Sequence, residues 1–381
     1  MMNDYLKTYV LTFKTKAPVF IGSGREISKK EYIFDQREGK ISYIDIDKMY
    51  LGLRKMHLER QYEDYLLNDT HTDLFSFLKE NRISRQVYQS WILYSEPAGD
   101  DELNSHSIKN VSEFVKGPDG LPYIPGSSIK GAFRTMLEVS AILRNQRHFS
   151  EMGDQIENAE FTGRRQYLRR EQMQINQDTL HRELFHDENG RYDRASLVND
   201  MMRGMYFADS KPLSFDNLCL CQKLDLNVSG VYKNLNVVRE CIKPGTIIEM
   251  ELTVDSAMCP YSNRDILNAV EDFYANCKTE FISKFQDAPP IGGNRTNFFL
   301  GGGAGYPSKT VLYAVLHGAE ARRVTSKVLN NTLPISVRKK HGHDRDVAIG
   351  ASPHILKCTE YGGRKYQMGA CCILKLNPLK E

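Results

Sequence analysis

The chain has 381 residues, of which 41% are hydrophobic and 26% are charged, a composition typical of globular proteins with ample material for a core. Its net charge of +3 neither indicates nor excludes a nucleic-acid partner, because phosphate recognition depends on local rather than total positive charge. No apolar run approaches the ~20 residues that a membrane helix needs, so we expect no membrane partner.

None of the eight cysteines forms a C-x-x-C pair, which argues against a zinc ribbon. Cys219 and Cys221 alternate within an apolar stretch, so both thiols lie on one strand face, where burial is favoured over metal binding. The first ten residues lack the hydrophobic region of a signal peptide. We therefore expect a cytoplasmic protein with reduced thiols, no bound metal and no cofactor.

The first third of the chain combines short strands with a helical segment. Residues 9–13 alternate like a strand, and the glycines of 21–24 predict a turn after it. Residues 32–34 and 41–44 are typical of a hairpin. From 47 to about 89, apolar residues recur every three or four positions, which predicts helices.

The rest of the chain adds strands around two main helices. One helix is expected within 121–140, an irregular and polar helical segment over 145–200, and a second main helix over 264–285. A glycine loop covers 298–310, and the remainder is strand-like and basic. The fold class is therefore α+β. Four strands are expected between the helices, at 205–207, 218–226, 231–240 and 247–254.

The most informative segment is 123–134, where a Pro-Gly break is followed by the start of a helix. Ser127 or Ser128 can cap this helix, and Lys130 and Arg134 lie four positions apart on one of its faces. Free N–H groups, two hydroxyls and two cations at a helix N-terminus suit a phosphate. An ordinary capped amphipathic helix with solvated charges remains the alternative.

A second candidate site is the glycine loop. It superficially resembles a P-loop, but Ser308 replaces the second required glycine and Pro307 removes an N–H group, so an NTPase is not expected. A loop that brings its backbone close to an RNA phosphate is the functional interpretation, and a flexible turn is the alternative. The candidate residues of this loop are Gly301, Gly302, Gly303, Gly305 and Lys309.

Two further features follow the glycine loop. The stretch 322–345 has seven Lys and Arg residues and a single acid, and we expect Arg338, Lys339 and Lys340 within it to contact nucleic acid rather than form a merely solvated face. Residues 341–344 read HGHD, which could ligate a metal or act in acid–base chemistry, but an exposed polar loop is favoured.

Several of these motifs together resemble the RAMP superfamily of CRISPR proteins. Residues 125–134 read PGSSIKGAFR and residues 301–305 read GGGAG; residues 21–24 also resemble the start of these proteins. The resemblance extends to ADS at 208–210 and to a hairpin that ends in VRE at 238–240, before a Pro-Gly-Thr turn. In length and order of elements, the chain is similar to the fifth Csm subunit of type III-A systems.

The resemblance implies an RRM-like (ferredoxin-like) core, with or without a degenerate second copy. Residues 1–254 would form this core, interrupted by helical insertions at about 47–110 and 141–203, and residues 255–381 would form a C-terminal RRM-like half. The hairpin at about 215–239 would match the thumb that family members wedge between guide and target bases.

The resemblance also implies a function. The chain would be a non-catalytic crRNA-binding subunit of a type III-A effector complex that caps the backbone at the crRNA 3′ end and aids crRNA maturation. The implied partners are crRNA, target RNA and other Csm subunits, especially the repeated backbone subunit, with a host nuclease as a further candidate. The expected RNA-binding residues are Ser127, Ser128, Lys130, Arg134, Gly301, Gly302, Gly303, Gly305, Lys309, Arg25, Arg239, Arg338, Lys339 and Lys340.

An enzyme of the same superfold is the rival hypothesis. A metal-independent endoribonuclease that processes precursor crRNA needs a base, an acid and cations on the phosphate, and His341, His343 and Lys309 would be its candidates. The target-cutting backbone subunit of the family carries an aspartate before the PGSS helix. Asp35 and Asp45 lie in that region here without the expected surroundings, so no catalytic residue is assigned.

Overall fold

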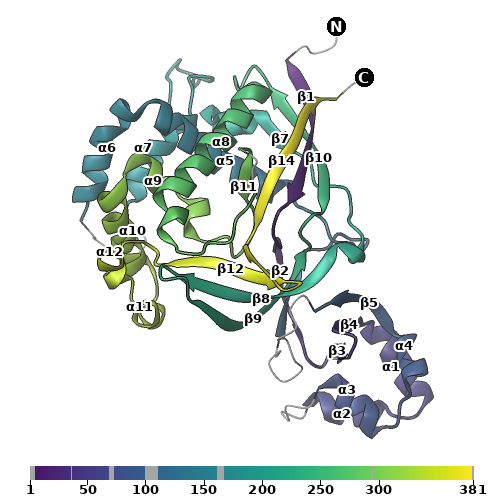
Figure 1. Ribbon diagram of the computed structural model, residues 1–381. Helices are drawn as coiled ribbons and strands as arrows, with labels where there is room; N and C mark the ends of the chain where they lie inside the picture. Colours follow the sequence, from purple (N-terminus) through teal and green to yellow (C-terminus); the bar gives the residue numbers. More distant parts are fainter. Residues whose placement is uncertain are drawn as a thin grey trace.

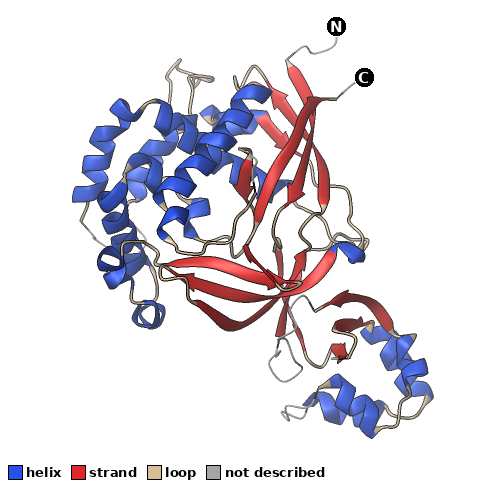
Figure 2. Cartoon of the chain, viewed as in Figure 1, coloured by secondary structure: helices blue, strands red, loops and turns tan. Residues whose placement is uncertain are grey.

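The computed structural model describes residues 5–35, 37–67, 73–98, 110–160, 167–292 and 295–379. A main body combines two sheets with a layer of helices, and a small lobe of strands and helices projects from its lower right (Figures 1 and 2). Over the described ranges the strands form a five-stranded, a six-stranded and a three-stranded sheet. Within the same ranges, no helix is long and apolar enough to cross a membrane.

The five-stranded sheet has the order β11-β14-β1-β10-β7, and all neighbouring strands are antiparallel. Strand β1 lies at its centre, and Leu11 and Phe13 of β1 are fully buried. Leu11 lies opposite both Met250 and Leu376, so the start, middle and end of the chain meet in one sheet. Its strands are β1 (Leu6–Thr15), β7 (Met205–Phe207), β10 (Ile247–Asp255), β11 (Asn297–Phe299) and β14 (Ala370–Pro378).

The six-stranded sheet has the order β13-β12-β8-β9-β6-β2 and is antiparallel except for the pair β6–β9. The four strands expected between residues 205 and 254 are confirmed as β7 to β10. The buried face of β8 carries Cys219 and Cys221, whose sulfur atoms lie 3.6 Å apart, so the expected burial of both thiols is confirmed. The strands are β2 (Gly22–Ser28), β6 (Asn110–Phe114), β8 (Leu218–Asn227), β9 (Tyr232–Ile242), β12 (Ile355–Tyr361) and β13 (Arg364–Gln367).

The turn expected at residues 21–24 is wrong in part, because strand β2 already begins at Gly22. The register of β2 against β6 shifts between Gly22 and Glu26, and Gly24 has a φ of +91°. Glycine tolerates this backbone geometry without strain, so the glycines serve an irregular strand rather than a turn.

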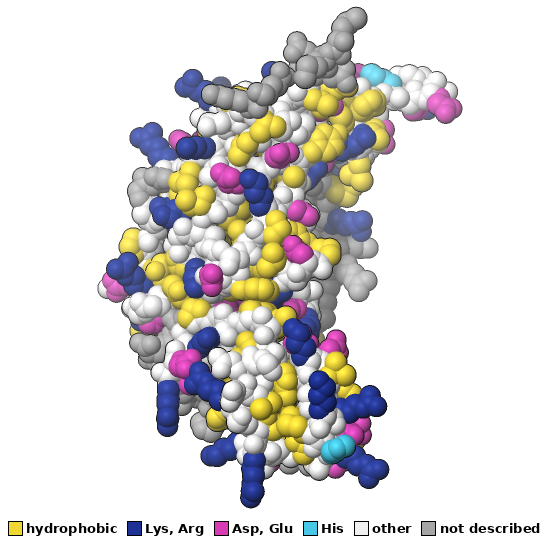
Figure 3. Space-filling view, turned by 90° about the vertical axis from the view of Figure 1, so that its right-hand side faces the viewer, with side chains coloured by type: hydrophobic (Ala, Val, Ile, Leu, Met, Phe, Trp, Pro, Cys, Tyr) yellow, Lys and Arg dark blue, Asp and Glu magenta, His cyan; other side chains and the backbone are white. Residues whose placement is uncertain are grey.

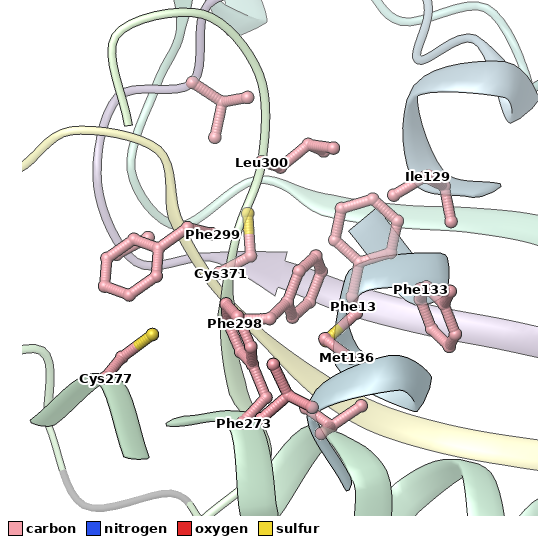
Figure 4. Packing of buried hydrophobic residues seen from close by; sticks show 14 of the residues in the cluster. Phe13, Ile129, Phe133, Met136, Phe273, Cys277, Phe298, Phe299, Leu300 and Cys371 are labelled. Carbon is pink, nitrogen blue, oxygen red and sulfur yellow. The ribbon is translucent and has the colours of Figure 1, made fainter. Parts of the chain in front are cut away.

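The longest helices, α5 (Gly126–Arg144) and α8 (Asn263–Glu280), pack on the five-stranded sheet (Figure 1). The predicted apolar stripe of α5 is confirmed: Ile129, Phe133 and Met136 point towards Phe13 and Phe298 in the core (Figure 4). The ring of Phe298 meets those of Phe13 and Phe133 at centroid distances of 5.6 and 6.4 Å. These aromatic contacts fix the direction of α5 over the sheet.

Further helices complete this layer. The irregular helical segment expected over 145–200 contains two regular helices, α6 and α7. The strand-like character expected after residue 310 is wrong up to residue 349, where helices follow one another. The longest of these helices is α10, and its buried residues Ala321, Val324 and Thr325 have helical spacing. The helices are α6 (Gln146–Asn158), α7 (Arg169–Leu180), α9 (Leu312–Val315), α10 (Gly318–Thr332), α11 (Ile335–His341) and α12 (Asp346–Ile349).

The small lobe has its own hydrophobic core around Trp91, the only tryptophan of the chain. The predicted hairpin and the helices expected over 47–89 are confirmed, and a strand not expected from the sequence completes the lobe's sheet. Tyr94 joins the lobe to the main body, because its ring stacks on that of Phe215 at 4.2 Å. The elements are β3 (Tyr32–Asp35), β4 (Lys40–Ile44), β5 (Ile92–Pro97), α1 (Ile46–Lys55), α2 (Glu59–Leu67), α3 (Leu74–Glu80) and α4 (Arg85–Gln89).

Candidate nucleic-acid interface

Four segments from different parts of the chain line one cleft with a volume of about 410 Å³. They are the start of β2, the first turns of α5, the glycine loop after β11 and the 3₁₀ turn Tyr306–Lys309. The fold thus brings together the three motifs that carry the family resemblance at residues 21–24, 125–134 and 301–305. The expected RNA-binding residues among those that line the cleft are Ser127, Ser128, Gly301, Gly302 and Lys309.

The N-terminus of α5 is held in place by the segment that follows β7. The N–H group of Gly126 donates to a carboxylate oxygen of Asp209 at 2.8 Å, and the N–H group of Ile124 donates to the hydroxyl of Ser210 at 2.9 Å. A side chain on Gly126 would overlap the carbonyl oxygen of Phe207. The Asp209-Ser210 pair therefore has a local role, which is to fix the break before the helix.

The hydroxyl groups of Ser127 and Ser128 have no hydrogen-bond partner among the described residues. Ser127 is exposed and Ser128 is half-buried, and both line the cleft. The expected capping role of these serines is wrong, because α5 begins at Gly126 with Pro125 as its N-cap. The first turn of α5 therefore offers two hydroxyl donors to a ligand, next to the positive end of the helix dipole.

The glycine loop packs against the chain just before β2. The N–H group of Gly302 donates to the carbonyl oxygen of Phe20 at 2.7 Å. Gly301 has a φ of +84°, and a Cβ atom at this position would overlap the same carbonyl oxygen. Only glycine fits this close approach, so the loop needs its glycines for packing as well as for any ligand.

Lys309 is the one Lys or Arg among the residues that line this cleft. Its side chain is exposed, and it makes no ion pair or hydrogen bond with the described part of the chain. The turn that carries it is stabilised by the hydroxyl of Ser308, which donates to the carbonyl oxygen of Gly305 at 2.8 Å. Lys309 can therefore meet an anion in the cleft without losing an internal partner.

Lys130 and Arg134 share a face of α5, as expected, but both engage partners within the chain. The ammonium of Lys130 donates to the carbonyl oxygen of Met205 at 2.9 Å, and burial lowers its pKa. The guanidinium of Arg134 lies 2.7 Å from a carboxylate oxygen of Asp200 and 3.4 Å from one of Glu138. A role for either cation in RNA binding stays a prediction, and the structure adds a structural role for both.

Arg239 lies beside the glycine loop, on strand β9. Its guanidinium is 5.1 Å from the centre of the Phe20 ring, and a side chain on Gly303 would overlap it. Burial lowers the pKa of Arg239, although nearby Asp225 acts in the opposite direction. Arg239 is therefore half-buried between an aromatic ring and the loop rather than fully solvated.

Sequence reasoning missed two lysines next to this arginine. Lys357 forms an ion pair of 2.9 Å with Asp225, and Lys357 also packs against Gly305 of the glycine loop. Burial lowers the pKa of Lys223, and the nearby positive charges of Lys357 and Arg239 lower it further. These cations come from β8, β9 and β12, so only the pairing of distant strands could have revealed them.

The remaining expected RNA-binding residues lie outside the cleft lining. Arg25 on β2 pairs with Glu31 and, at 3.8 Å, with Glu113. The expected RNA-binding residues Arg338, Lys339 and Lys340 are all exposed on the short helix α11. Their contact with RNA stays a prediction.

The segment HGHD at 341–344 is not the exposed polar loop that we expected. His343 is buried, and its ring contacts Asp346 rather than the adjacent Asp344. His341 is half-buried, and its ring stacks on that of His343. The correction has a local reason, because the 3₁₀ turn after α11 directs His343 inward, while Asp344 is exposed.

Charge is mixed over the face of the molecule shown in Figure 3. Lys and Arg side chains are spread over this face among acidic and hydrophobic ones, rather than gathered in one field. This distribution agrees with the small net charge and indicates local binding sites rather than a uniformly basic surface.

Comparisons with known proteins agree with the α+β fold. Residues 12–306 match the family model of the RAMP superfamily, so the chain belongs to that superfamily. Among individual proteins, it is similar to the CRISPR system Cms protein Csm5 of Streptococcus thermophilus, with 27% identity covering 88% of this chain and 89% of that protein. The Csm5 protein of Enterococcus italicus is 25% identical, with 98% of this chain and 99% of that protein covered.

Two solved structures share the fold. One is a chain of a cryo-EM structure of a Csm-crRNA-target RNA ternary complex of a type III-A CRISPR-Cas system, with a TM-score of 0.61 and 20% identity, covering 96% of this chain and 100% of that one. The other is the crystal structure of Csm5 from T. onnurineus, with a TM-score of 0.58 and 16% identity, covering 95% and 100%. The α+β fold expected from the sequence is therefore that of the RAMP proteins.

Proposed function

We propose that this protein is a non-catalytic, RNA-binding subunit of a type III-A CRISPR effector complex. The observation that carries the proposal is the convergence of Ser127, Ser128, Gly301, Gly302 and Lys309 on one cleft. Relatives named Csm5 and a structural neighbour from a Csm-crRNA-target RNA complex support the same function.

The cleft suits the phosphate backbone of RNA better than a base. Two free hydroxyls, a helix N-terminus and an unpaired ammonium are donors that complement an anion. The N–H group of Gly126 already donates to Asp209, so the serine hydroxyls and Lys309 would make the main contacts with the phosphate. Such contacts give affinity and position the RNA without reading its sequence.

The bound RNA would be the 3′ part of the crRNA, paired or unpaired with target. In this arrangement the chain would cap the backbone of repeated subunits and aid crRNA maturation by recruiting a separate host nuclease. The family resemblance supports these finer points, together with the basic helix α11, which offers Arg338, Lys339 and Lys340 to RNA or to a neighbouring subunit.

We also propose that the core is RRM-like. Strands β1, β7, β10 and β14 lie in the order β14-β1-β10-β7, and α5 and α8 pack on them, as a ferredoxin-like arrangement requires. The small lobe and the helices α6 and α7 would then be the two insertions expected at about 47–110 and 141–203, with the first starting before residue 47 because β3 and β4 belong to the lobe. The C-terminal half from 255 to 381 supplies α8, β11 and β14, so it completes this core as well as carrying the glycine loop.

The hairpin of β8 and β9 is the candidate thumb. Its tip exposes Val231, and Val237 is exposed further along β9. Apolar side chains of this kind can insert between bases that are splayed apart. The base of the hairpin lies next to the glycine loop through Arg239, so thumb and cleft would contact the same RNA.

The test is RNA binding by the variant Lys309→Ala, with Lys278→Ala as a matched control, because Lys278 is exposed on α8 outside the cleft. Fluorescence anisotropy with single-stranded RNA at several salt concentrations gives affinity and salt slope. We expect Lys309→Ala to weaken binding to all sequences and to reduce the slope by about 0.7. Equal affinity and slope for Lys309→Ala and the wild type would contradict the proposal.

A further inference from the structure

A group of three side chains near the C-terminus lies outside the cleft and has no part in the proposed RNA contacts. Suitable donor atoms of His343, Asp346 and His354 all lie within 4.8 Å of one another. The Nδ1 atom of His343 is 3.0 Å from one carboxylate oxygen of Asp346, and the Nδ1 atom of His354 contacts the other oxygen. Two imidazoles therefore face one carboxylate from opposite oxygens.

The three side chains all lie within the short segment 343–354. His343 lies in the 3₁₀ turn His343–Arg345, Asp346 opens α12, and His354 directly precedes β12. The hydroxyl of Ser326 on α10 donates to the carbonyl oxygen of His343 at 2.6 Å. The three donors are therefore positioned by neighbouring elements rather than by a loose loop.

The charge of Asp346 needs compensation. Asp346 is fully buried, and it makes no ion pair with a Lys or Arg side chain of the described residues. Its partners are the two imidazoles and the hydroxyl of Ser352, which donates to it at 2.7 Å. A divalent cation between the carboxylate and the two imidazoles would supply a positive charge that no Lys or Arg of the described residues supplies.

We propose that His343, Asp346 and His354 bind one divalent transition-metal ion. Two imidazole nitrogens and one carboxylate oxygen suit first-row ions such as Zn²⁺ and Co²⁺, and they disfavour Mg²⁺ and Ca²⁺, which prefer oxygen ligands. Three protein ligands leave a fourth position for water. The hydroxyl of Ser352 supports the site from outside, because it orients the ligating carboxylate.

The ion would also order the segment that carries the basic helix. α11 ends at His341, two residues before His343, so an ion that joins His343 to the start of β12 fixes where α11 leaves the main body. Metal binding to a short segment contributes directly to the stability of that segment. The exposed residues Arg338, Lys339 and Lys340 should then be cut more slowly by trypsin when the ion is present.

The experiment is titration of the metal-stripped full chain with Zn²⁺ and with Co²⁺, whose visible absorption reports its ligands. The variants are Asp346→Asn and His354→Gln, and the control is His186→Gln at an exposed histidine. We expect one ion per chain and slower trypsin cleavage in the wild type and the control. Each ligand variant should bind the ion at least about tenfold more weakly. Even the loss of a residue that only orients a metal ligand typically lowers metal affinity by that factor.

Two results would show that these three side chains do not bind the ion. One is a wild-type chain that binds neither Zn²⁺ nor Co²⁺ stoichiometrically, and the other is unchanged affinity in Asp346→Asn, which would leave a hydrogen-bonded His-Asp-His network without an ion. If Asp346→Asn is misfolded by circular dichroism, His354→Gln decides, because its side chain lies nearer the surface. Binding of Mg²⁺ as tight as that of Zn²⁺ would also contradict the ligand assignment.

Discussion

The guanidinium of Arg134 donates a hydrogen bond of 2.7 Å to the carboxylate of Asp200 and thereby joins α5 to the turn before β7. Asp200 is buried, and its other carboxylate oxygen accepts the N–H group of Met202 at 2.8 Å. Arg134→Ala leaves this carboxylate without its cation, so we expect the free energy of unfolding to fall by about 1–3 kcal/mol. Denaturant unfolding of the purified chain measures this change.

A double-mutant cycle with Asp200→Asn separates the structural role of Arg134 from an RNA contact. If the pair is structural, the two substitutions together should cost clearly less than the sum of their separate effects. RNA affinity per folded molecule should then change little. Unchanged stability with a weaker RNA affinity and a lower salt slope would instead show that Arg134 faces RNA.

The glycine loop should not tolerate a side chain at Gly301. Its φ of +84° is unfavourable for alanine, and the new Cβ atom would overlap the carbonyl oxygen of Phe20. We expect Gly301→Ala to lower the unfolding free energy by about 2 kcal/mol or more. Its control is Gly131→Ala, because Gly131 lies in α5 with nothing within 4 Å of an added Cβ, and alanine should stabilise the helix by about 0.5–1 kcal/mol. Equal stability of the two variants would contradict this account of the loop.

Glu138 should make stability fall as pH rises. Burial raises its pKa to about 7 from the ordinary value of 4.5, and this effect outweighs the attraction of Arg134. The native state therefore binds the proton more tightly than the unfolded state. The stabilising contribution is complete below about pH 4.5 and is lost as pH rises through about 7.

The measurement is the unfolding free energy between pH 4 and pH 8 for wild type and Glu138→Gln. We expect the variant to lack this decline, with a difference of at most about 3 kcal/mol at the upper end. Glu188→Gln, at an exposed position, should follow the wild type. A wild-type slope that persists in Glu138→Gln would assign the decline to another group.

The sequence predicts local elements of the fold well, and it predicts contacts between residues far apart in the sequence poorly. The apolar stripe of α5 and the four strands β7 to β10 are predicted from short stretches of sequence, and both predictions are confirmed. Helix α10 was missed because Thr325 and Ser326 lie on its buried face and interrupt the apolar pattern. The cleft itself depends on strand pairings between β1, β14 and β11, which no short stretch specifies.

The same limit applies to individual site residues. The family resemblance placed Ser128 and Gly301 near RNA, and their convergence on one cleft follows from the fold. The spacing of Lys130 and Arg134 indicated a shared face, but their partners Met205 and Asp200 are distant in the sequence. Contacts across such separations become visible only in three dimensions.

The small lobe should unfold in a way that its single tryptophan reports. Trp91 lies in the lobe's separate core, and a Cβ atom on Gly52 of α1 would come within 2.5 Å of its ring. Gly52→Ala must therefore displace the ring, at a cost of about 1–3 kcal/mol that exceeds the helix gain of alanine.

We expect the fluorescence transition of Trp91 to move to lower denaturant, while the far-UV circular dichroism transition of the larger main body moves less. Leu51→Ala, at an exposed neighbour on the same helix, should leave both transitions in place. Coincident shifts of the two signals in Gly52→Ala would contradict this prediction and show that the lobe and the body, which meet where Tyr94 stacks on Phe215, unfold as one cooperative unit.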